Sequence, residues 1–142
     1  WYYTVHGEAI GHAQTHAHGH LKAFMEFGMR YNMAEFRAGW QMAGTHLVQR
    51  LADKNHRWDR TGLGALVPNG LAQSTMGYAF NCPDMIGGGQ YTDFVEEGTL
   101  EPKGGFELDE ELFVRYAQTS ALFPMMQFSL APWRVLSQEN LK

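Results

Sequence analysis

Apolar side chains recur at spacings of three and four near the start of the chain, at Leu21, Phe24, Met25 and Met29. Such a stripe lies along one side of an α-helix, so we predict a helix over residues 7–28. A second helix is expected between an N-cap at Asp59 and about Met76, with a kink or break at Pro68. A third is expected to open at residues 108–116, where acidic residues in the first turn complement the helix dipole.

Four short runs with the composition of β-strands alternate with these helices, at residues 32–37, 46–53, 78–82 and 125–130. The predicted order is therefore helix, strand, strand, helix, strand, helix, strand. The first two runs end in Arg37 and Asp53, and Asp84 follows the third at the start of a glycine-flanked loop. Parallel α/β barrels present their working side chains at the carboxyl ends of their strands, so we expect these three residues to converge on one pocket.

The chain has 142 residues, the length of one ordinary domain, and alternates helices with strands as an α/β protein does. Its 44% of hydrophobic residues and 13% of aromatic residues exclude a disordered chain. It begins Trp-Tyr-Tyr without a methionine, and we interpret it as a fragment. A complete eight-stranded α/β barrel needs about 250 residues, so this length would supply roughly half of one.

The formal net charge is −4, and the lysines and arginines are scattered along the chain. Phosphate backbones are bound by concentrated positive charge, so nucleic acid is not expected as a partner. The longest apolar stretch, residues 121–133, is interrupted by prolines and polar residues and falls short of the roughly 20 residues that a membrane-spanning helix needs. The single cysteine, Cys82, lies in an apolar run, which favours a buried structural thiol.

Four segments carry motifs that are individually weak but occur in a consistent order and spacing. They are Glu-Phe-Arg-Ala-Gly-Trp at 35–40, Arg-Leu-Ala-Asp-Lys-Asn at 50–55 followed by Trp58, Pro-Asp-Met-Ile-Gly-Gly at 83–88, and Ala-Leu-Phe-Pro-Met-Met-Gln-Phe-Ser at 121–129. With these segments the chain resembles glycoside hydrolase family 31, whose members are retaining α-glycosidases built on a (β/α)8 TIM barrel. The resemblance implies that residues 1–142 form the C-terminal half of such a barrel, from the loop after strand 4 to strand 8.

The same resemblance implies roles for three residues. Asp53 stands where the family has its general acid/base, Arg37 where an arginine binds sugar hydroxyls, and Asp84 where an aspartate binds the substrate. A retaining glycosidase uses two carboxyl groups about 5–5.5 Å apart, one to attack the anomeric carbon and one to protonate the leaving oxygen. The family's nucleophile is an aspartate at the end of strand 4, which we expect upstream of Trp1. The implied partner is an oligosaccharide or glycoside substrate, and no cofactor is expected.

The last predicted strand departs from the pattern of many α-glucosidases in the family. Those enzymes carry an arginine and a histidine where this chain has Gln127 and Ser129. The Met-Gln-Phe-Ser pattern instead resembles a branch for which an α-galactoside is the better expectation. We therefore predict hydrolysis of a terminal α-linked galactose or glucose, by a protein of which this chain alone is inactive because a retaining mechanism needs both carboxyl groups.

Less specific interpretations compete with these roles. Asp53 could be a surface loop acid or a turn cap, and Asp84 could shape the turn before the glycines. Arg37 could pair with Glu35, which shares its strand face at a spacing of two. Trp58 and Trp133 are more typical of a hydrophobic core than of a platform for sugar rings. Three positively charged residues follow the predicted acid and would oppose its protonated form unless they point away, namely Lys54, His56 and Arg57.

Two other functions are compatible with the sequence. The tract from His6 to His20 contains a His-x-His-x-His run that could chelate zinc, as in a zinc-dependent barrel hydrolase, although a solvated helix face is the plainer interpretation. The second alternative is a carbohydrate-binding or inactive barrel remnant. It predicts the same sugar contacts from Arg37 and Asp84 without turnover.

Overall fold

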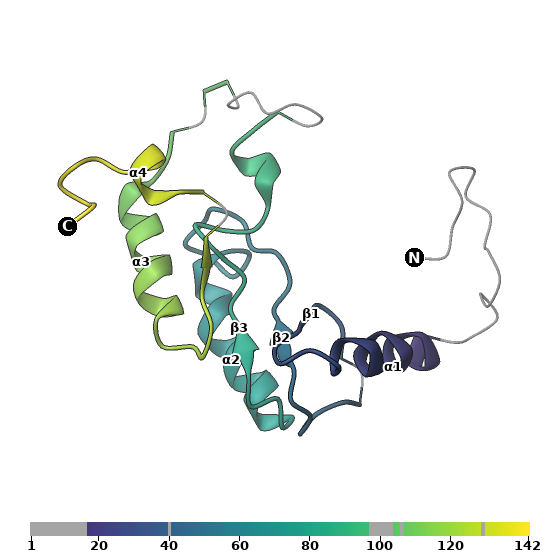
Figure 1. Cartoon of the computed structure of the whole chain (residues 1–142). Coiled ribbons are helices and arrows are strands. Elements are labelled where there is room, and N and C mark those ends of the chain that lie inside the picture. Colours follow the sequence, from purple (N-terminus) through teal and green to yellow (C-terminus); the bar gives the residue numbers. More distant parts are fainter. Residues whose placement is uncertain (1–16, 40, 97–103, 106, 129) are drawn as a thin grey trace.

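The computed structural model describes residues 17–39, 41–96, 104–105, 107–128 and 130–142. The helices in these residues are α1 (Ala17–Gly28), α2 (Leu66–Thr75), α3 (Glu110–Ser120) and α4 (Pro132–Val135). The strands are β1 (Glu35–Phe36), β2 (Val48–Arg50), β3 (Asn81–Cys82), β4 (Met85–Ile86) and β5 (Gln127–Phe128). The predicted order of the major elements is confirmed, and the short elements β4 and α4 are additions to it (Figure 1).

Every pair of neighbouring strands is parallel. Strands β1, β2 and β3 form one sheet in that order, and β4 pairs with β5 in a second. The helices α2 and α3 lie on one side of the strands, and α1 lies beyond β1 (Figure 1). The protein is thus a mixed α/β structure with parallel strands, and the part of the chain that the structure describes does not close into a barrel.

Side chains alternate between two faces of these strands, as the pleat of a strand requires. The outer face packs against α2 and α3 in a core formed by Leu51, Leu66, Ile86, Leu112, Phe113 and Tyr116. The inner face carries Glu35, Arg50, Cys82, Asp84 and Gln127, which contact one another or share a register. Arg50 lies opposite Cys82 in the register of β2 and β3, and its neighbour Leu51 points the other way into the core.

Helices α1 and α3 agree with the predictions from apolar spacing and charge. Residues 17–28 of the first predicted helix are helical, and its predicted part before Ala17 lies outside the described residues. In α3 the side chain of Asp109 caps the helix by accepting a hydrogen bond from the backbone N–H of Leu112 at 2.9 Å. An N-cap of this kind stabilises a helix by about 1 kcal/mol.

The helix predicted from Asp59 to Met76 is wrong in its first half. Oδ1 of Asp59 accepts hydrogen bonds from the backbone N–H of Thr61 at 2.8 Å and from its hydroxyl at 2.6 Å. Asp59 therefore closes a local turn instead of capping a helix. Helix α2 begins only at Leu66, after a 3₁₀ turn, so Pro68 is its third residue, where a missing N–H costs no helical hydrogen bond.

Candidate functional site

Three neighbouring parallel strands deliver polar residues to one edge of the sheet. Arg37 directly follows β1, Asp53 lies three residues beyond the end of β2, and Asp84 lies two residues beyond the end of β3. Because the three strands run in the same direction, their carboxyl ends meet at the same edge. The local sequence thus places all three predicted residues where a parallel sheet collects functional groups.

A continuous chain of ion pairs joins these residues through a fourth, Arg50. Nη2 of Arg37 lies 2.5 Å from Oδ1 of Asp53. Nη2 of Arg50 lies 4.0 Å from Oδ1 of Asp53 and 2.5 Å from Oδ1 of Asp84. We call Arg37, Arg50, Asp53 and Asp84 the strand-end cluster. The geometry brings the three predicted residues together, while their roles stay predictions.

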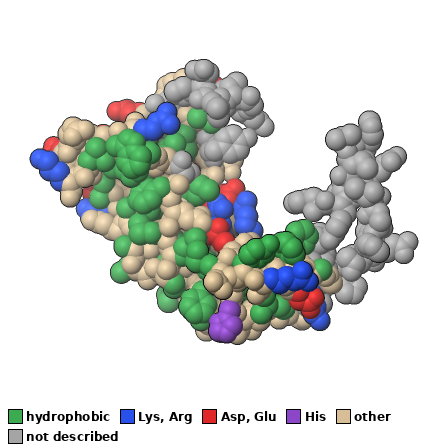
Figure 2. Space-filling model, viewed as in Figure 1, with side chains coloured by type: hydrophobic (Ala, Val, Ile, Leu, Met, Phe, Trp, Pro, Cys, Tyr) green, Lys and Arg blue, Asp and Glu red, His purple; other side chains and the backbone are tan. Residues whose placement is uncertain are grey.

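The strand-end cluster is open at one end and closed at the other. The side chains of Arg37 and Asp53 are 58% and 36% exposed, whereas those of Arg50 and Asp84 are 13% and 0% exposed. Acidic and basic side chains lie side by side on the surface near the strands (Figure 2). Because the two signs alternate, the cluster presents paired donors and acceptors and suits a polar, hydroxyl-rich ligand better than a polyanion.

Asp84 is the most constrained residue of the cluster. Its φ of +80° is rare for a residue with a side chain, and only 1% of the residue is exposed. Oδ1 accepts hydrogen bonds from Nε and Nη2 of Arg50 at 2.7 and 2.5 Å. Oδ2 is buried and has no hydrogen-bond partner among the described residues. A role in shaping the turn would explain the backbone conformation but not the bound guanidinium.

Arg50 was not among the residues predicted from the sequence. Burial lowers the pKa of Arg50, but the hydrogen bond and charge of Asp84, together with the charges of Glu35 and Asp53, outweigh this and raise it. A signal for Arg50 does exist in the sequence. It is a charged residue inside a strand-like run, next to the apolar Leu51, and so must find polar partners on the opposite face.

Lys54 is the positively charged neighbour that stays close to the acids. The residue is 3% exposed, and its Nζ donates a hydrogen bond to the carbonyl oxygen of Ala52. Burial lowers the pKa of Lys54, and the charges of Asp84 and Asp53 oppose that shift. The expected conflict between a protonated acid and nearby positive charge therefore applies to Lys54.

His56 and Trp58 are turned toward the start of α3 instead. Nδ1 of His56 lies 2.8 Å from the carbonyl oxygen of Gly87, and Nε2 accepts a hydrogen bond from the backbone N–H of Asp109 at 3.1 Å. Nε1 of Trp58 donates to Oδ2 of Asp109 at 2.8 Å. The interpretation of Trp58 and Trp133 as core residues is wrong, because they are 50% and 74% exposed.

The inner face continues below the cluster with two further polar residues. Nε2 of Gln127 lies 2.9 Å from each carboxylate oxygen of Glu35. The alternative pairing of Arg37 with Glu35 is therefore wrong, since Arg37 pairs with Asp53. Burial, with the help of Glu35, raises the pKa of Cys82 to about 12, so this fully buried thiol stays protonated. The prediction of a buried structural thiol is confirmed.

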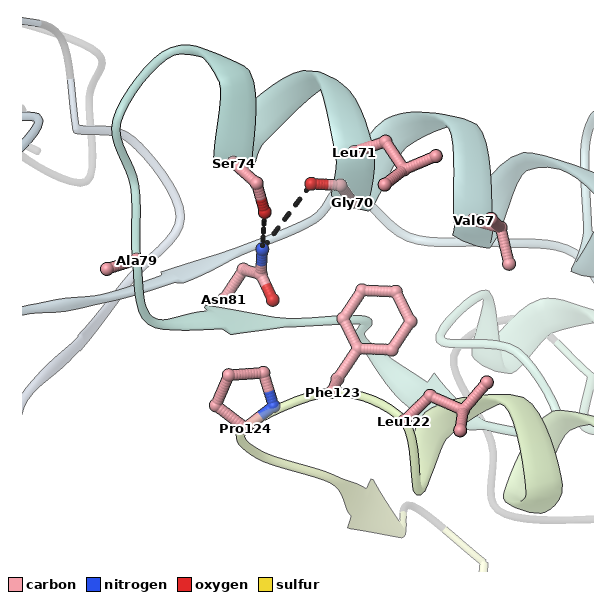
Figure 3. A pocket seen from close by; sticks show the side chains of 9 residues that line it. All are labelled: Val67, Gly70, Leu71, Ser74, Ala79, Asn81, Leu122, Phe123 and Pro124. Atoms are coloured by element: carbon pink, nitrogen blue, oxygen red, sulfur yellow. Dashed lines mark hydrogen bonds between the residues drawn. The ribbon is translucent and has the colours of Figure 1, made fainter.

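A pocket of about 320 Å³ lies apart from the strand-end cluster. Its lining comes from α2, from the residues around β3 and from the turn before β5, namely Val67, Gly70, Leu71, Ser74, Ala79, Asn81, Leu122, Phe123 and Pro124 (Figure 3). Nδ2 of Asn81 donates to Oγ of Ser74 at 3.1 Å, which leaves the pocket mainly apolar. None of the four cluster residues lines it, so we place the candidate site at the cluster.

The metal alternative is not tested by the structure. The tract from His6 to His20 lies outside the residues whose side chains are described, as does Ser129. Among the described residues, no group of three or more His, Cys, Asp or Glu side chains is arranged to hold a metal ion. Within the same residues, no helix is long and apolar enough to cross a membrane.

The chain is similar to part of two longer proteins. It is 38% identical over 105 residues to the myogenesis-regulating glycosidase of Mus musculus and 40% identical over 84 residues to the SITS-binding protein of Tetronarce californica. These matches cover 73% and 59% of this chain but only 14% and 10% of the two relatives. No family model matches the chain. The chain is thus a partial homologue of a protein named as a glycosidase.

Proposed function

We propose that this chain is part of the catalytic (β/α)8 barrel of a retaining α-glycosidase of glycoside hydrolase family 31. The parallel strands β1, β2, β3 and β5, with α2 and α3 packed on their outer face, are consistent with the C-terminal half of such a barrel. The similarity to a protein named as a glycosidase supports the same proposal. The reaction is the hydrolysis of a terminal α-linked sugar.

One observation carries the proposal. Arg37, Asp53 and Asp84 were predicted from three separate sequence motifs, and they lie in one chain of ion pairs at the carboxyl ends of neighbouring strands. Arg37 and Asp53, which are 16 positions apart in the sequence, are in direct contact there. Convergence at this edge is how barrel enzymes build their sites.

In the proposed mechanism Asp53 is the general acid/base. It protonates the departing glycosidic oxygen in the first step and takes a proton from water in the second. The attacking carboxylate is contributed by a segment outside this chain, about 5–5.5 Å from Asp53 in the assembled site. Because Arg37 is in contact with Oδ1 of Asp53, substrate binding must exchange this ion pair for contacts between Arg37 and sugar hydroxyls.

A side chain of the inner face, Gln127, is relevant to which sugar is bound. Gln127 stands where many α-glucosidases of the family carry an arginine, and its side chain is held by Glu35 with Oε1 buried and unpartnered among the described residues. An amide offers a hydrogen-bond acceptor to the sugar, whereas a guanidinium offers only donors. Because Gln127 departs from the α-glucosidase pattern in this way, we propose an α-galactoside as the preferred substrate and an α-glucoside as the second choice.

The proposal is tested by assaying the longer protein that contains this segment on aryl α-galactosides and aryl α-glucosides. We expect Asp53→Asn to lower kcat by at least about 100-fold, since general acid/base groups contribute roughly 10²–10⁴-fold. The matched control is Asp59→Asn, because Asp59 is an exposed acid that only closes a local turn. Sugar binding without any turnover by the wild-type protein would favour the carbohydrate-binding remnant instead.

A further inference from the structure

Arg50 lies between Asp53 and Asp84. The proposed function gives a role to each of these acids but none to Arg50. We propose that Arg50 is a positioning residue of the sugar site, which fastens Oδ1 of Asp84 so that Oδ2 is presented as the acceptor for one sugar hydroxyl. This inference rests on the proposed function and adds to it a residue to which the sequence motifs had given no role. It assigns Arg50 no contact with the reacting atoms.

The hydrogen-bond geometry is unusual in using a single carboxylate oxygen. A guanidinium and a carboxylate commonly pair through two parallel hydrogen bonds that occupy both oxygens. Here Nε and Nη2 of Arg50 both donate to Oδ1 of Asp84, at 2.7 and 2.5 Å. Two donors from one rigid plane fix the orientation of the carboxylate, and they leave Oδ2 without a partner among the described residues.

The unpartnered oxygen of Asp84 points to a ligand. A buried polar atom without a hydrogen bond destabilises the folded state, and more so when it is charged, so such atoms in folded proteins call for an explanation. Gly89 borders Oδ2 so closely that a Cβ at this position would lie only 2.2 Å from it. Only glycine therefore lets the loop backbone pass this close to the buried oxygen.

Arg50 is also the cation best placed to organise the acids around it. Its side chain is 13% exposed, and it interacts with the charges of Asp84, Glu35 and Asp53. The buried cation Lys54 donates a hydrogen bond to the carbonyl oxygen of Ala52 instead. Loss of Arg50 would release Asp84 from its fixed orientation and leave the acid buried without its paired guanidinium.

The inference predicts a distinctive change in the kinetic constants of Arg50 variants. An error in sugar placement weakens ground-state and transition-state binding alike, whereas an error in proton delivery affects only substrates with poor leaving groups. We expect Arg50→Ala to lower kcat/KM by about 100-fold, the upper end of the effect of losing one hydrogen bond to a charged group. The loss should be the same for good and poor leaving groups and should appear mainly in KM.

The experiment measures kcat and KM of the longer protein for aryl α-galactosides of both leaving-group classes. The variants are Arg50→Ala, Arg50→Lys and the control Arg115→Ala, whose guanidinium is half-exposed and pairs with Glu111 on the surface of α3. Guanidinium chloride at sub-denaturing concentration should restore part of the activity of Arg50→Ala, and the control should be unchanged. If Arg50→Ala does not fold, Arg50→Lys keeps the charge and should still lose at least about tenfold in kcat/KM, because an ammonium cannot supply the planar pair of donors.

Three results would overturn the inference. These are unchanged kcat/KM in both variants, a loss confined to poor leaving groups, and a lower melting temperature with normal kinetics of the folded protein. A wild-type protein without activity would refute the proposed function separately. Calorimetric binding of galactose then decides the inference: weaker binding by Arg50→Lys supports it, and equal binding, or no binding by the wild type, refutes it.

Discussion

The outer and inner faces of the same short strands carry very different side chains. Leu51 and Ile86 point outward into an apolar core with Phe113, whereas Arg50 and Asp84, each one or two residues away, point inward into a chain of charges. The outer face is stabilised by removing apolar surface from water, at about 25 cal/mol per Å². The inner face contains buried charges whose pairing only offsets the loss of hydration. We therefore expect substitutions on the outer face to change mainly the stability of the fold and substitutions on the inner face to change mainly the activity.

The largest expected effect on folding lies on the outer face. Phe113 is 1% exposed, stacks near Phe128 and packs against Gly87, so Phe113→Ala should remove a well-filled part of the core. We expect a loss of about 3–5 kcal/mol in the free energy of unfolding, measured by urea denaturation. Leu122→Ala is the control, because that side chain is 82% exposed and should change stability very little. A loss below about 1 kcal/mol at Phe113 would contradict the assignment of the core.

The smallest expected effect on folding lies at the open end of the strand-end cluster. The Arg37–Asp53 pair is short but largely exposed, so Arg37→Ala should lower the free energy of unfolding by no more than about 1 kcal/mol. The same urea experiment with Lys22→Ala, which removes an exposed pair on α1, provides the matched comparison. A loss of 3 kcal/mol or more (roughly the cost of breaking a buried pair) would show that Arg37 holds the fold together.

This contrast also explains which features could be predicted from the sequence. Apolar spacing predicted the described part of α1, and acidic residues in the first turn predicted α3, because both signals are local to the helix. The same reasoning failed at Asp59, where Thr61 offered its hydroxyl and N–H to the same carboxylate and a local turn formed instead of a helix cap. Turns and caps use the same residue types, so sequence alone does not separate them.

The candidate site was predictable only in part for a related reason. Arg37, Asp53 and Asp84 are marked by motifs and by their positions after strands. The contact between Arg50 and Asp84 joins residues 34 positions apart and depends on the register that sets Arg50 opposite Cys82. Such pairings are fixed by tertiary structure. The hydrogen bond from Trp58 to Asp109 at the start of α3 is likewise a tertiary contact that no local sequence pattern predicts.

The central claim is that Asp53 is a general acid/base and not a structural partner of Arg37. The most direct test is Asp53→Ala in the longer protein, with activated aryl glycosides compared with substrates that have poor leaving groups. We predict that hydrolysis of the poor substrates is abolished, while activated substrates still complete the first step and the glycosyl-enzyme accumulates, because only the deprotonation of water is then missing. Added azide should restore turnover by attacking without a base. An equal loss on both substrate classes with no rescue by azide would contradict the claim and make Asp53 structural.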